Sequence, residues 1–114
     1  MPAPSKRMLR AVKVAHTIVW AFLVAVILAI PVMAWQERFT TVAWLIAIML
    51  VETAVLVGNG WRCPLTDLAA RYTDDRRANF DIYLPLWLAA NNKWIFGSIL
   101  AAGLVFAIGV RLTR

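Results

Sequence analysis

The chain has few of the residues from which most enzyme and metal sites are built. Its 114 residues include one cysteine, one histidine and six acidic side chains. The single cysteine, Cys63, excludes a disulfide within the chain, and the single histidine, His16, excludes a metal site with several histidine ligands from one chain. The P-loop, nucleophile-elbow, HExxH and paired-cysteine motifs are also missing. The sequence therefore carries no recognisable metal or catalytic motif.

Apolar residues dominate what remains. They make up 62% of the chain, and the mean hydropathy is +0.72. About 20 consecutive apolar residues cross the hydrocarbon layer as a helix, because lipid offers no partner for backbone polar groups. We predict an all-α integral membrane helical bundle with three transmembrane helices and one or two interfacial amphipathic helices. It forms a single membrane domain over residues 1–114, with spans at about 12–34, 40–58 and 93–111. A tight turn at 36–38 is expected to join the first two spans, and Gly58-Asn59-Gly60 is expected to end the second.

Positive charge predicts the orientation. The net charge is +6, and the basic residues stand at the ends of the apolar stretches. With the N-terminus in the cytoplasm, nine basic residues lie inside and three outside, which fits the positive-inside rule. The outside group is Arg38, Arg111 and Arg114. We expect a multi-pass protein of the cytoplasmic (inner) membrane with a cytoplasmic N-terminus. The first apolar stretch also resembles a signal peptide. It is longer than the apolar region of a usual signal peptide, so we expect an uncleaved span.

The segment 61–91 between the second and third spans is predicted to be interfacial. Pro64 suits the first position of a short amphipathic helix. Thr73, followed by two aspartates, suits the N-cap of a second helix, in which Pro85 marks a kink or a boundary. Alternatively, residues 80–90 enter the membrane in part, since eleven residues are too few to cross it.

Polar residues inside the predicted spans are the first candidate site. His16, Glu52 and Ser98 each lie about 8–9 Å below the cytoplasmic surface, at 1.5 Å per residue. An ionised glutamate facing lipid is costly, so we expect Glu52 to be protonated or paired with His16. The pair is interpreted as a packing hydrogen bond, or else as a proton-handling or ligand-binding site. Haem ligation by His16 requires a second ligand, such as His16 of another copy.

Side chains at the cytoplasmic end are the second set of candidates. Cys63 is either a buried, inert residue, a thiol activated by a neighbouring arginine, or a palmitoylation site. Four basic residues are predicted to contact lipid head groups or a partner, with a solvated surface as the alternative. They are Arg71, Arg76, Arg77 and Lys93. In the third span, Gly97 and Ala101 form a small-xxx-small pair that favours close helix packing.

A short motif follows the second predicted span. It reads Trp61, Arg62, Cys63, Pro64, Leu65, Thr66. It resembles the Trp-x-Cys-Pro-Leu-Thr motif of a family of small bacterial membrane proteins catalogued as a domain of unknown function. Two apolar spans precede the motif there, and a Tyr-Leu-Pro-like stretch follows, as at 83–85 here. The family's usual glutamate after the motif is replaced by alanine. The resemblance covers about residues 12–110 and implies a bacterial cytoplasmic-membrane protein, without a substrate or a catalytic residue.

These observations support three functional hypotheses. The leading one is a non-catalytic accessory or assembly subunit that contacts a protein partner or further copies of itself. The second is a small redox or ligand-binding protein that uses His16 and Glu52 with haem or quinone. The third is a subunit of an oligomeric transporter or channel. We expect the lipid bilayer as an environment and no nucleic acid, because the basic and aromatic residues flank apolar spans. No cofactor is expected outside the haem alternative.

Overall fold

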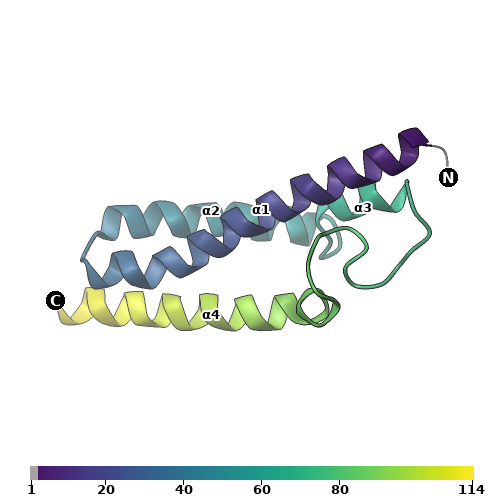
Figure 1. The fold of residues 1–114 in the computed structure, drawn as a ribbon. Helices are drawn as coiled ribbons and strands as arrows, with labels where there is room; N and C mark the ends of the chain where they lie inside the picture. Colours follow the sequence, from purple (N-terminus) through teal and green to yellow (C-terminus); the bar gives the residue numbers. More distant parts are fainter. Residues whose placement is uncertain (1–2) are drawn as a thin grey trace. The chain divides into compact units, whose positions relative to one another are not determined.

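The computed structural model describes residues 3–114 of the chain, and the described part is helical without β-strands. Three of its four helices are long and apolar enough to cross a membrane, with the first candidate span beginning at Lys6. The predicted fold class, three spanning helices with one additional short helix, is confirmed. Figure 1 shows the elements α1 (Ala3–Trp35), α2 (Phe39–Gly58), α3 (Pro64–Ala70) and α4 (Leu86–Thr113).

The connection from α1 to α2 is a Schellman turn. Glu37 has a φ of 60°, and its N–H donates to the carbonyl of Ala34 at 2.9 Å. The Arg38 N–H donates to the carbonyl of Met33, also at 2.9 Å. These two bonds satisfy carbonyls that the end of a helix leaves without partners. The tight turn predicted at residues 36–38 is confirmed.

α2 ends in the same way at a glycine. Gly60 has a φ of 66°, a backbone conformation that glycine adopts more readily than residues with a side chain. Its N–H donates to the carbonyl of Val57 at 3.4 Å. The Trp61 N–H donates to the carbonyl of Leu56 at 2.7 Å. The predicted break after Gly58 is therefore confirmed.

The chain divides into two compact units, one of residues 3–21 with 55–91 and the other of 22–54 with 92–114. The second unit has an apolar core to which α1, α2 and α4 all contribute. Ile30 on α1 is fully buried there. The other buried members are Val26, Ile27, Ala34, Val42, Met49 and Ala107.

α4 packs against α1 in this core at Gly103. A Cβ at Gly103 would lie 3.4 Å from Cδ of Pro31 and 3.9 Å from Cγ2 of Ile30. Gly97, by contrast, has no neighbour within 4 Å of a Cβ, and it is exposed. Within this unit the small residue that meets another helix is therefore Gly103, and the predicted Gly97 pair is not what brings α4 against α1.

The first unit combines helices with an irregular segment. α3 begins with Pro64 at the predicted first position and carries a buried alanine, Ala69. The segment 71–85 then runs without regular secondary structure to α4, as the green part of the chain in Figure 1 shows. Val12 on α1 and Ile82 in the segment 71–85 are also buried.

The second interfacial helix predicted from Thr73 is wrong. The Thr73 hydroxyl accepts a hydrogen bond from the Asp75 N–H at 3.1 Å, and the Asp75 carboxylate accepts one from the Arg77 N–H at 2.9 Å. Such local bonds give the backbone an alternative to helix formation. The helix begins only after Pro85, whose carbonyl accepts from the Ala89 N–H at 3.0 Å. α4 thus starts at residue 86, earlier than the predicted span.

A leucine at position 103 tests the packing of the second unit. We expect Gly103→Leu to lower the free energy of unfolding by about 1–3 kcal/mol, because the added side chain overlaps Pro31. Gly109→Leu is the matched control, since a Cβ there meets nothing within 4 Å. Unfolding in one detergent, followed by circular dichroism, measures both. Equal stability of the two variants would contradict the packing described.

Candidate functional site

The centre of the candidate site is Asp81, in the irregular segment before α4. The residue is 5% exposed, and among residues 6–114 it is the one charged residue that is buried. A buried carboxylate is costly unless hydrogen-bond donors replace the lost water. The surroundings of Asp81 must therefore supply such donors.

Two helices of the same unit supply them. The Thr66 hydroxyl on α3 donates to Oδ2 of Asp81. His16 on α1 donates from Nδ1 to the Asp81 carbonyl oxygen at 3.1 Å, and the same nitrogen lies 3.4 Å from Oδ2. Because a carbonyl oxygen only accepts, this bond places a proton on Nδ1. We call His16, Thr66, Asp81 and their neighbour Cys63 the Asp81 cluster.

Cys63 joins the cluster through the imidazole. Its side chain lies beside that of His16 and interacts with it, and it is half-buried at the residue before α3. With Nδ1 engaged by Asp81, a neutral His16 ring has Nε2 left as an acceptor. The cluster thus brings a thiol, an imidazole and a carboxylate together.

A second tie joins the irregular segment to α1 close by. The Tyr83 N–H donates to the Thr17 hydroxyl at 3.0 Å, and this hydroxyl donates to the Lys13 carbonyl at 2.7 Å. The Lys13 ammonium lies 4.4 Å from the centre of the Tyr83 ring, a cation–π contact. The segment is therefore attached to α1 at two residues, Asp81 and Tyr83.

Exposed charges line the first part of the segment. Asp75 and Arg77 form an ion pair with 2.8 Å between Oδ2 and the guanidinium. The side-chain hydrogen bond from Arg77 lowers the pKa of Asp75 to about 2. Arg76 donates to the carbonyls of Thr73, Asp75 and Ala70. These bonds shape the turn that precedes Asp81.

The remaining motif residues stabilise the start of α3. Arg62 pairs with Asp67 at 3.3 Å, and the Asn59 amide donates to Asp67 at 2.9 Å and to the Arg62 carbonyl at 2.8 Å. Trp61 is exposed and has a φ of 65°. Of the six motif residues, Cys63 and Thr66 belong to the Asp81 cluster.

The predicted polar layer is divided between the units. His16 belongs to the first unit, whereas Glu52 and Ser98 belong to the second. The Ser98 hydroxyl donates to the Trp94 carbonyl of its own helix at 2.6 Å. Glu52 is half-buried. The pairing of His16 with Glu52 stays a prediction.

Sequence reasoning missed Asp81 and the role of Thr66 toward it. The available signal was the position of Asp81 between two apolar residues, Phe80 and Ile82, where an ionised side chain is unexpected. The predicted basic residues are exposed as expected, with Arg71, Arg76 and Arg77 in the first unit and Lys93 in the second.

No group of three or more His, Cys, Asp or Glu side chains in the described part of the chain has the geometry to hold a metal ion. Haem ligation by His16 with a ligand from another copy stays a prediction. Comparison of the chain with protein-family models, curated proteins and solved structures gives no match. The resemblance of the motif to the family with Trp-x-Cys-Pro-Leu-Thr therefore also stays a prediction.

Replacement of the buried carboxyl tests the cluster. We expect Asp81→Ala to lower the free energy of unfolding by about 1.5–3 kcal/mol, because the Thr66 hydroxyl loses its charged acceptor and His16 loses its contact with Oδ2. Proteolysis within residues 71–85 should then become faster. Asp74→Ala removes the same charge from an exposed residue of the same segment and should change neither measurement. Equal protease resistance of both variants and the unaltered chain would contradict the role of Asp81.

Proposed function

We propose that this chain is a non-catalytic accessory or assembly subunit of the cytoplasmic (inner) membrane, with its N-terminus inside. It works through contacts with a protein partner or with further copies of itself. The observation that carries this proposal is the attachment of the irregular segment 71–85 to α1 and α3 by the Asp81 cluster.

The attachment turns a connection into a defined surface. A long irregular connection loses conformational entropy when it is ordered, so an ordered one needs specific bonds. Here a buried carboxylate, a threonine hydroxyl and a histidine ring supply them. Loops that a rigid scaffold positions commonly carry binding residues.

The side chains that the segment exposes suit protein contact. Arg76, Arg77 and Tyr83 are exposed, and Trp87 at the start of α4 is 65% exposed. Arginine, tyrosine and tryptophan are the residue types that most often dominate binding energy at protein interfaces. We call this set, Arg76, Arg77, Tyr83 and Trp87, the segment surface.

The polar interior supports a structural use of the cluster. In the part of the chain that the structure describes, every buried side-chain nitrogen or oxygen has a hydrogen-bond partner. A fully bonded buried network rigidifies the structure and specifies one conformation. This favours a non-catalytic reading of His16, Thr66 and Asp81.

The spanning helices leave much apolar surface for lipid or for other helices. In the most apolar window of each span, 22%, 11% and 17% of the residues are buried within the chain for α1, α2 and α4. Association of helices in a membrane relies on packing of such surfaces. The same surface would serve the alternative of an oligomeric transporter, which requires further copies to enclose a path.

A photocrosslinking residue at Tyr83 tests the proposal in intact cells. We expect a specific protein adduct that becomes several-fold weaker when Asp81→Ala is added, because the segment surface loses its position. Adding Asp74→Ala instead should leave the adduct unchanged. The mass of the adduct separates a partner from a second 12.8 kDa copy of this chain. Absence of any adduct at Tyr83, or an adduct insensitive to Asp81→Ala, would argue against the segment surface.

The second candidate function is a reactive thiol, favoured by the contact between Cys63 and His16. A nucleophile beside a base that a third group orients is the usual arrangement of an activated thiol. In this reading His16 accepts the Cys63 proton while Asp81 holds the ring. This is the thiol version of the redox hypothesis.

Alkylation of Cys63 by a maleimide distinguishes this candidate. Activation predicts a rate that falls by about 100-fold in His16→Ala, the lower end of what a positioned base supplies. Since the substitution also disturbs the segment, Thr66→Val serves as a control that loosens the cluster and keeps the imidazole. An equal rate in all three proteins would remove the thiol function and leave the contact role.

A further inference from the structure

A groove runs between α2 and α4 in the second unit. Its volume is about 500 Å³, in the range of small-molecule sites. It extends from Leu104 to Leu112 on α4, eight residues or about 12 Å along the helix. The lining residues are Phe39, Val42, Ala43, Ile46, Leu104, Ala107, Ile108, Arg111 and Leu112.

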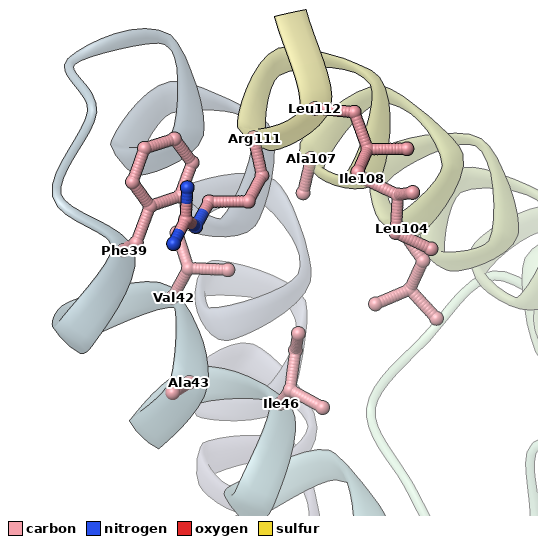
Figure 2. A pocket seen from close by; sticks show the side chains of 9 residues that line it. All are labelled: Phe39, Val42, Ala43, Ile46, Leu104, Ala107, Ile108, Arg111 and Leu112. Carbon is pink, nitrogen blue, oxygen red and sulfur yellow. The ribbon is translucent and has the colours of Figure 1, made fainter. Parts of the chain in front are cut away.

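The groove is apolar except at one end. Figure 2 shows the Arg111 side chain reaching from α4 toward Phe39 and Val42, while the other side chains shown are hydrocarbon. The Arg111 guanidinium carbon lies 5.5 Å from the centre of the Phe39 ring. A slot of hydrocarbon with a cation at its mouth matches a ligand with an apolar tail and an anionic head.

The Arg111 donors are available for such a head. Within the described residues, the cation–π contact with Phe39 is the interaction recorded for this side chain, and no carboxylate or carbonyl accepts from it. A guanidinium presents five N–H donors in a planar fork that fits two phosphate oxygens. A bound phosphate would therefore satisfy donors that the protein leaves to solvent.

The other charges at this end of the unit also favour an anionic head group. Glu37 faces Arg114 at 3.9 Å, and Arg114 also donates to the Trp35 carbonyl at 3.0 Å. Arg38 is exposed and carries a further positive charge. The one acidic side chain here is thus compensated by Arg114, and Arg38 and Arg111 remain to attract an anion.

The geometry points to an anionic phospholipid as the occupant, with one acyl chain in the groove between α2 and α4 and its phosphate on Arg111. Both helices are candidate membrane spans, so the groove opens where acyl chains are present. Its length of about 12 Å is close to half of a hydrocarbon core of about 30 Å. The basic end then lies at head-group depth.

Native mass spectrometry of the full chain tests this inference. The protein is purified in mild detergent and offered phosphatidylglycerol and phosphatidylcholine of equal chain length in equal amounts. We expect retention of the anionic lipid to exceed that of the zwitterionic lipid by about fivefold. This is the difference in affinity that one arginine near an anionic head group supplies. Arg111→Gln should abolish this preference. Arg10→Gln, the same change on an exposed residue of the first unit, should preserve it.

A second pair of variants tests the acyl chain. Ala43→Phe fills the groove and should lower retention of both lipids, whereas Ala54→Phe, at an exposed position of α2 outside the lining, should not. Circular dichroism confirms that each variant keeps its helices. Equal retention of the two lipids by the unaltered chain would overturn the inference. So would an equal loss of the preference in Arg111→Gln and Arg10→Gln, or a dimer of this chain that retains no lipid.

Discussion

Asp81 brings a carboxylate into an interior made almost entirely of hydrocarbon, and the first unit is arranged around its need for hydrogen-bond donors. The Thr66 hydroxyl on α3 donates to this carboxylate, and Nδ1 of His16 on α1 lies 3.4 Å from it and donates to the Asp81 carbonyl. Because each donor has a fixed place on a helix, the carboxylate can be satisfied by only one path of the segment that carries it. Order in the segment 71–85 follows from this requirement, and so does the set of side chains that the segment exposes.

The two units are stabilised by different interactions. The first is held by polar bonds between elements distant in sequence, such as the 65 residues that separate His16 from Asp81. The second is held by apolar packing around Ile30 and by the close approach at Gly103, with its arginines at one end. Polar attachment suits a surface that must have one conformation to contact a protein. Apolar helices with a groove suit contact with acyl chains, which need no fixed partner geometry.

Most of the fold was predictable from the sequence, and much of the site was not. The spans, the turn at 36–38, the break after Gly58 and Pro64 as a helix start all depend on local residue patterns. The helix expected from Thr73 failed because the bonds of Asp75 to Arg77 compete with a helical backbone. Three members of the Asp81 cluster, His16, Cys63 and Thr66, were named as candidates, but not as neighbours of one acid.

The sequence by itself determined the number and the length of the apolar helices, because lipid requires each segment to satisfy its own backbone hydrogen bonds. It also determined where these helices end, through glycine, proline and short polar turns. Only the tertiary structure decided which acid meets His16. That choice depends on the path of an irregular segment, and no periodic pattern encodes such a path; it is selected by the donors that two separate helices bring to one carboxylate.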